Sequence, residues 1–297
     1  MGLMLAILPM KNIKKVSVHG GHSGEFCLHA KDMLEDIIKK YIKEDFEWIG
    51  ITQHCPPIND ELRYPDEKDA NLSAEQLKQQ FQNYISKIKK LKKKYASKIK
   101  IFTAFESEAY DGYIDYTKDL IQTYRPDYIV GSVHHIDNFC FDFSKKMYEE
   151  SVAAAGSIDL MYEKYFDKQY EIISILKPAV IGHFDLIRIF DRDYRHRIQQ
   201  KNIWGKIIRN LKACKKNDLI LDFNTRALKK KAEEPYVSKE ILSKALELDI
   251  KVVPGDDSHG IEDIGTDIKK GISILSENGF NTDWPEPKIY QYSNIPD

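Results

Sequence analysis

The sequence predicts an α/β fold organised around seven parallel strands, and two observations support this prediction. Short runs rich in β-branched and aromatic residues alternate with amphipathic stretches along all 297 residues. No repeat, low-complexity tract or Pro/Gly-rich linker divides the chain. Strands that alternate with helices form parallel sheets, and right-handed crossovers would let such a sheet close into a barrel. We therefore expect one domain over residues 13–297, preceded by an extension over residues 1–12.

The predicted strands and helices follow one another in order. Strands are expected at 13–18, 48–52, 99–104, 128–133, 179–182, 219–224 and 251–254, and helices at 33–42, 73–88, 158–176, 204–214 and 238–248. The helix that begins after Ser73 has the strongest signal, because Gln76 completes a capping box and Leu77, Phe81 and Tyr84 start a buried stripe.

Composition and charge exclude several classes of partner. Lys and Arg number 45 against 46 Asp and Glu, so no overall field favours nucleic acid or an anionic membrane. The lysines between 87 and 100 are best interpreted as a solvated helix face, because no arginine and only one aromatic residue, Tyr95, lie among them. Four cysteines without a CxxC pair favour the reducing cytoplasm. The apolar opening MGLMLAILPM is too short to cross a bilayer and does not resemble a signal peptide.

Histidines gather at the ends of the predicted strands. The stretch 17–30, SVHGGHSGEFCLHA, contains three of the nine histidines, and four more follow later strands, together with two acids. Because the carboxyl ends of barrel strands open on one face, these side chains should meet there and could satisfy two or three divalent metal ions. The set is His19, His22, His29, His54, Glu106, His134, His183, Asp257 and His259.

Each histidine also has a structural interpretation. A lone histidine such as His183 is more often a hydrogen-bonded core residue than a ligand, but several core histidines would not all choose strand ends. His135 should point away from the mouth if His134 points into it, and His196 should be exposed in the charged stretch DRDYRHR. His19 and His22 are three apart and should face opposite sides of a strand, so we expect a bulge or tight turn at Gly20 and Gly21.

The motifs at these positions resemble those of the PHP (polymerase and histidinol phosphatase) superfamily, and in particular its histidinol-phosphate phosphatase branch. The matching segments are HGGHSGEFCLHA, GITQHCPP, AFESEAY, GSVHHID, IGHFDLIR, LDFNTRALKK followed by EEPY, and GDDSHGIEDIG, in the family's order. The resemblance implies a distorted seven-stranded (β/α)7 barrel that holds up to three ions of zinc, iron or manganese.

The resemblance also assigns ligands to each ion. It implies that His19, His22, Glu106 and Asp257 hold the first metal, and that Glu106 bridges to a second held by His134 and His183. A third would be held by His29, His54 and His259. The chain departs from the family pattern in its opening, which is usually His-x-His, and in its last motif, where Asp256 adds a carboxylate.

The chemistry expected of such a site is metal-dependent hydrolysis of a phosphomonoester, with Glu106, Asp257 and His259 central to catalysis. Arg188 and Arg226 follow strands and suit a bidentate grip on phosphate, and Asn224 could orient the substrate. A metal-bound water, His135 or Asp256 could each serve as the leaving-group acid. The NTRALKK and EEPY segments resemble the phosphatase branch of the family more than the nuclease branch, and this resemblance implies L-histidinol phosphate as the substrate. The alternatives are a phosphodiesterase or exonuclease, and a metal-binding regulatory module without turnover.

Overall fold

Seven parallel strands form the centre of the molecule. The computed structural model describes residues 13–292, so the predicted extension lies outside the described residues. The strands pair in the order β1-β2-β3-β4-β7-β8-β9. Their bounds are β1 Lys15–Ser17, β2 Phe46–Ile51, β3 Lys100–Ser107, β4 Tyr128–Gly131, β7 Val180–Ile181, β8 Ile220–Asn224 and β9 Lys251–Gly255.

The sheet curls until its two edges nearly meet, as predicted for a barrel. The amide of Val18, just past β1, donates to the carbonyl of Pro254 on β9 at 3.0 Å, and Asp257 N donates to His19 O at 2.8 Å. Both faces of the strands are covered, and Ile49, Ile129, Val180 and Leu221 are fully buried. This is why the strands appear in the sequence as continuous apolar runs instead of alternating ones.

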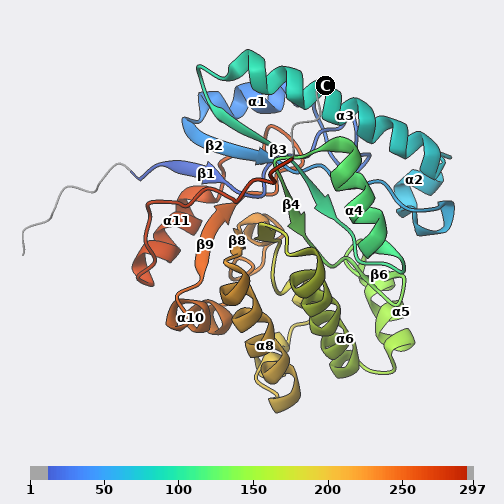
Figure 1. The fold of residues 1–297 in the computed structure, drawn as a ribbon. Helices are drawn as coiled ribbons and strands as arrows, with labels where there is room; N and C mark the ends of the chain where they lie inside the picture. Colours follow the sequence, from blue (N-terminus) through green and yellow to red (C-terminus); the bar gives the residue numbers. More distant parts are fainter. Residues whose placement is uncertain (1–12, 293–297) are drawn as a thin grey trace, which may run out of the picture.

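Helices surround the strands on the outside (Figure 1). They are α1 Leu34–Lys43, α2 Pro65–Asp69, α3 Ala74–Tyr95, α4 Tyr113–Tyr124, α5 Lys145–Ala155, α6 Ile158–Glu171, α7 Tyr194–Ile198, α8 Lys201–Asn217, α9 Arg226–Lys229, α10 Lys239–Glu247 and α11 Ile268–Glu277. The capping box at Ser73 is confirmed. One predicted helix, 158–176, is divided into α6 and a turn of π-helix, Ile172–Leu176. The predictions lacked α2, α4, α5, α7, α9 and α11.

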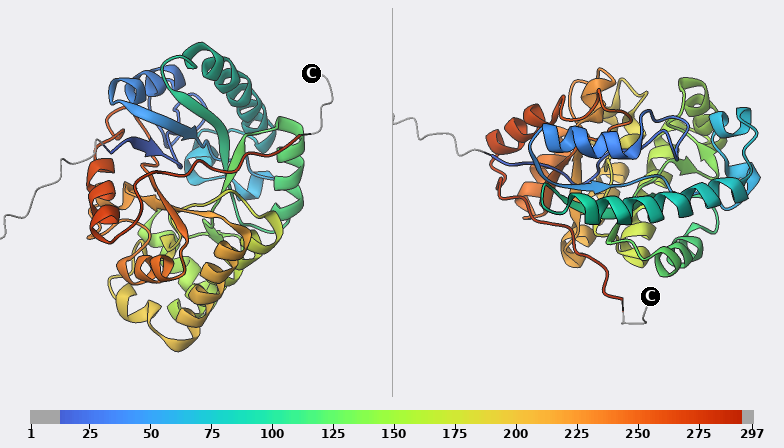
Figure 2. Two further views of the ribbon diagram at one scale, coloured as in Figure 1. Left: turned by 60° about the vertical axis from the view of Figure 1, so that its left-hand side comes forward. Right: turned by 90° about the horizontal axis from the view of Figure 1, so that it is seen from above.

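The lysine-rich part of α3 lies on the outer surface beside α1 (Figure 2). Its lysines are paired with carboxylates: Lys87 with Glu25, Lys92 with Asp127 and Lys94 with Glu35. The interpretation of this run as a solvated helix face is thus consistent with the structure, because much of its charge is already neutralised.

The bulge expected at Gly20 and Gly21 is not formed there. Strand β1 ends at Ser17, the chain bends at Val18 and His19, and the register irregularity lies between Lys15 and Val16. Gly20 instead allows its backbone to lie close to that of Gly50, because a Cβ on Gly20 would be 2.1 Å from the carbonyl oxygen of Gly50. His22 turns inward because its amide donates to the Ser258 carbonyl at 2.7 Å, outside any strand pairing.

The C-terminal segment, residues 279–292, runs across the amino ends of the strands, where it is coloured red in Figure 1. Trp284 donates through Nε1 to the carbonyl of Lys14, and Tyr290 N donates to the Asp127 carbonyl. Glu286 pairs with Lys100, and Lys288 pairs with Asp218 at 2.8 Å. We call this segment the C-terminal strap; it covers the end of the barrel opposite the histidines.

Candidate metal centre and cavity

Glu106 lies at the centre of the histidine cluster. It is near the carboxyl end of β3, 1% exposed, and each of its oxygens faces two or more imidazoles. Its Oε1 lies 3.0 Å from His134 Nε2 and 2.9 Å from His183 Nε2. Its Oε2 lies 3.3 Å from both His19 Nε2 and His54 Nδ1. Burial alone would raise the pKa of Glu106, but the surrounding imidazoles hold it well below its usual range.

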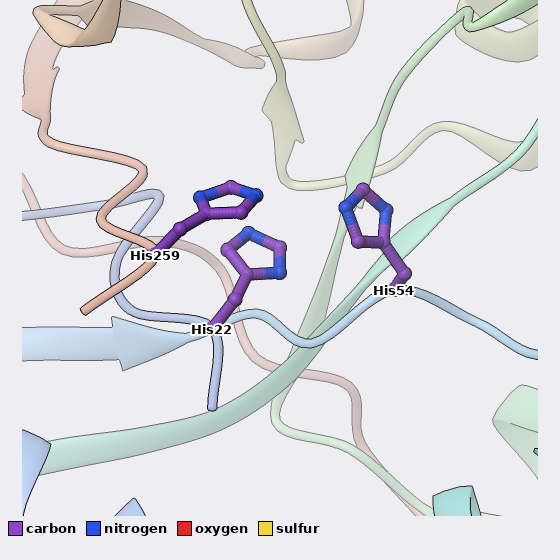
Figure 3. A group of neighbouring side chains, drawn as sticks. All are labelled: His22, His54 and His259. Carbon is purple, nitrogen blue, oxygen red and sulfur yellow. The ribbon is translucent and has the colours of Figure 1, made fainter. Parts of the chain in front are cut away.

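A second group of rings adjoins Glu106. His22 Nε2 lies 3.3 Å from Asp257 Oδ1, and the His22 ring stacks on that of His259 with centroids 4.4 Å apart. Figure 3 shows the rings of His22, His54 and His259 turned toward a common space. The His29 ring lies 4.9 Å from His54 and 5.5 Å from His259. The structure therefore brings all nine predicted ligand candidates together.

The donor atoms form overlapping groups, within each of which all atoms lie within 4.8 Å of one another. These groups are His19–His22–Glu106, His54–Glu106–His134, His19–His183–Asp257, His22–His54–His259 and Cys27–His29–His54. Several side chains belong to more than one group, so the assignment of particular ligands to a first, second and third ion stays a prediction.

The residues fit metal ions because several buried ring nitrogens lack hydrogen bonds. Both Nδ1 and Nε2 of the fully buried His22 make none, and the same holds for Nε2 of His19 and Nδ1 of His54. Leaving a buried polar atom unsatisfied costs about 1–3 kcal/mol. Burial also lowers the pKa of His22 to about 3, which keeps its ring in the neutral form that binds metals. These histidine and carboxylate clusters could hold metal ions.

Three further carboxylates orient the rings, and sequence reasoning missed them. Asp222 Oδ2 lies 2.9 Å from His19 Nδ1 and accepts from the His183 amide at 3.2 Å. Asp142 Oδ2 lies 2.9 Å from His134 Nδ1, and His134 holds the pKa of Asp142 at about 2 although burial would raise it. Glu108 lies 3.2 Å from His54. Such carboxylate–histidine pairs fix which ring nitrogen faces a metal.

Asp222 could have been found from its position in β8. It lies two residues before Asn224, so the two side chains share a face of the strand. Asn224 donates to Asp222 at 3.0 Å and to Asp257 Oδ2 at 3.1 Å, and it is fully buried. Asn224 therefore positions two acids of the cluster, and it is not among the residues that line the cavity.

A cavity of roughly 200 Å³ opens beside the cluster. Its walls combine ring nitrogens and carboxylates with apolar and cationic side chains. The lining comprises His29, His54, Tyr64, Glu106, His134, Asp142, Phe143, His183, Leu186, Arg226, Lys230, Tyr236, Asp257 and His259.

The two predicted arginines have different positions. Arg226 lines the cavity, where its Nη1 donates to the Asp257 carbonyl at 3.0 Å and to Asp263 at 3.2 Å. Arg188 does not line it. Its guanidinium is 4.5 Å from the centroid of the Tyr236 ring and donates to Asp185 and to the Pro235 carbonyl. The structure thus places only Arg226 where it can meet a ligand in the cavity.

The residues considered as leaving-group acids lie away from the cavity. Asp256 is buried and accepts hydrogen bonds from Ser17 Oγ at 2.6 Å and Tyr41 Oη at 2.8 Å. His135 faces Glu108 at 3.3 Å and packs on Tyr110. It belongs to an antiparallel hairpin of β5, His135–Ile136, and β6, Phe139–Cys140, that the predictions lacked. His196 is on the surface, with its side chain 76% exposed.

A family model for the PHP domain matches residues 20–226. The chain belongs to the PHP family. A relative from Schizosaccharomyces pombe, named "Probable histidinol-phosphatase", is 32% identical over 271 residues, covering 90% of this chain and 88% of that protein. The "Histidinol-phosphatase" of Bacillus subtilis is 30% identical over 255 residues, covering 81% and 92%.

A solved structure supports the fold. The histidinol phosphate phosphatase of Lactococcus lactis, described in complex with zinc, L-histidinol and phosphate, aligns with a TM-score of 0.69 at 18% identity, covering 90% of this chain and 95% of that one. The predicted family and the predicted seven-stranded barrel are confirmed. None of the helices among residues 13–292 is long and apolar enough to cross a membrane.

Proposed function

We propose that this protein is a metal-dependent phosphatase that hydrolyses L-histidinol phosphate to L-histidinol and phosphate, using two or three ions of zinc, iron or manganese. The observation that carries the proposal is the pair of unsatisfied nitrogens on buried His22, set among eight other ligand candidates beside a cavity. The names of the Schizosaccharomyces and Bacillus relatives support the choice of substrate.

The residues of the chain divide the work of such a reaction. Bound divalent ions would supply Lewis-acid charge to the phosphate oxygens and an activated water as nucleophile. Glu106 and Asp257, oriented by the imidazoles and by Asn224, would hold the ions in place. Arg226 and Lys230 line the cavity and would neutralise the remaining phosphate charge. Tyr64 and Phe143 would pack against the imidazole of the substrate.

The surface charge of α3 counts against a nuclease. The lysine-rich face of α3 is paired with carboxylates, and a polynucleotide would need a basic groove with stacking aromatics. The ligand set also counts against a module without turnover, because all nine candidates are present and adjoin a cavity that Arg226 and Lys230 also line.

Phosphate release by the purified protein tests the proposal. With manganese or zinc added, histidinol phosphate should be hydrolysed with a higher kcat/KM than serine phosphate or p-nitrophenyl phosphate. Equal rates for all three esters would overturn the substrate assignment. Hydrolysis of single-stranded DNA together with no release from monoesters would favour the nuclease alternative.

A further inference from the structure

Cys27 lies beside the ligand candidates, and neither the family's ligand set nor the predicted one includes it. One donor atom each from Cys27, His29 and His54 lies within 4.8 Å of the other two. Among residues 13–292, which contain all four cysteines, no other cysteine joins such a group.

The turn that carries Cys27 is built to point this thiol inward. The amides of Phe26 and Cys27 both donate to the Ser23 carbonyl at 3.0 Å, and Ala30 N donates to the Cys27 carbonyl. Cys27 is 8% exposed, whereas Leu28 beside it is 43% exposed. The turn therefore presents Cys27 and His29 to the cluster and leaves Leu28 in solvent.

The two imidazoles of the group are prepared to bind a metal. His29 Nδ1 lies 3.3 Å from Asp66 Oδ2, which leaves the other ring nitrogen of His29 for a ligand. His54 Nδ1 faces Glu108 Oε1 at 3.2 Å, which leaves the other ring nitrogen of His54 for a ligand. Each imidazole of the group thus has a carboxylate behind one nitrogen, the arrangement usual for metal-binding histidines, and this is an indication independent of the cysteine that an ion belongs here.

We propose that Cys27 is a thiolate ligand of the metal ion held by His29 and His54. On binding, the thiol loses its proton to solvent and the sulfur donates an electron pair to the ion. Thiolate sulfur favours zinc over manganese, so this site would select zinc while the groups around Glu106, with only nitrogen and oxygen donors, would accept either metal. The proposal rests on the metal binding proposed above and is independent of the substrate.

Cobalt(II) substitution tests the sulfur ligand without any activity measurement. The metal-depleted wild type, titrated with cobalt, should develop the near-ultraviolet charge-transfer band of a cobalt thiolate. Cys27→Ser should lose this band and keep the visible bands of cobalt bound by nitrogen and oxygen. Cys214→Ser is the matched control, because Cys214 is buried in α8 and belongs to no ligand group. A band that is absent from the wild type, or that persists in Cys27→Ser, would overturn the proposal.

X-ray absorption of the wild-type zinc protein gives a second test that needs no variant. A sulfur shell at about 2.3 Å from zinc is expected in addition to nitrogen and oxygen. Zinc surrounded by nitrogen and oxygen alone would rule out Cys27 as a ligand. A sulfur shell in a protein that releases no phosphate from histidinol phosphate would retain this ligand and reject the proposed substrate.

Discussion

The two ends of the barrel are built on opposite principles. At the carboxyl ends of the strands, buried imidazoles and carboxylates crowd around Glu106, and several of their nitrogens have no hydrogen bond. At the amino ends, the C-terminal strap satisfies backbone groups at Lys14, Pro126 and Asp127 and pairs surface charges. At the first end, polar groups without hydrogen bonds are available to bind metal ions. At the second end, polar groups form hydrogen bonds and ion pairs that stabilise the fold. Substitutions at the two ends should therefore separate activity from stability.

The largest effect is expected from Glu106→Gln. This change keeps the shape of the side chain but removes the charge that faces five imidazoles. The ligand groups that share Glu106 should then no longer bind metal ions. We expect kcat/KM to fall about 10³-fold, which corresponds to a loss of about 4 kcal/mol in the stabilisation of the transition state by the metal ions. Phosphate release and metal content measure the loss. Glu286→Gln, the same chemical change in the strap, should leave both unaltered, and equal losses in the two variants would contradict the comparison.

At the closed end, Trp284→Ala should show the reverse behaviour. The indole is 9% exposed and donates to the Lys14 carbonyl, so truncation loses apolar burial and leaves an acceptor unpaired. We expect the free energy of unfolding to fall by about 3 kcal/mol. Urea denaturation measures this change. The kcat/KM at a temperature where the variant is folded should stay within about twofold of wild type, and a larger loss would show that the two ends are coupled.

Asp222→Asn tests the role of the carboxylates behind the ligands. The variant keeps the size of the side chain but loses the negative charge beside His19 and the His183 amide. We expect metal affinity to weaken about 10- to 100-fold, measured by competition with a metal indicator. Asp218→Asn is the control. Asp218 precedes the same strand but pairs with Lys251 and Lys288 at the closed end, away from the metal ligands. Similar affinities in Asp222→Asn and wild type would show that the ring orientation does not depend on this charge.

The smallest effect is expected from the ion pairs of the strap. Lys100 and Glu286 are 54% and 45% exposed in their side chains, so solvent screens their attraction. Lys100→Ala should lower the free energy of unfolding by at most about 0.5 kcal/mol, again measured by urea denaturation. A loss approaching that of Trp284→Ala would mean that charge, and not apolar packing, holds the strap in place.

The sequence allowed prediction of the seven strands and of the residues that gather at their carboxyl ends, because both follow from local patterns. A strand that is buried on both faces is a continuous apolar run, and a histidine just after it must emerge at the mouth. The functional roles of the nine residues stay predictions.

Other features depend on partners that are remote in the sequence. Arg188 follows a strand like Arg226, but Tyr236 and the Pro235 carbonyl, almost fifty residues later, capture its guanidinium. The local sequence of the strap also does not predict that it covers the amino ends of the strands, because it contacts residues up to 270 positions away. The register of His22 depends on Ser258 in the same way.

The strap also determines on which side of the barrel the two ends of the described chain lie, and therefore where a tag or support can be attached. Ile13 borders the same hollow as Trp284, and Tyr292 Oη donates to the Pro126 carbonyl, so both ends of the described chain lie at the closed end of the barrel. A tag, a fused protein or a solid support joined directly at Ile13 or at Tyr292 would start on the side facing away from the cavity. Immobilised in this way, the barrel would present its mouth to the surrounding solution.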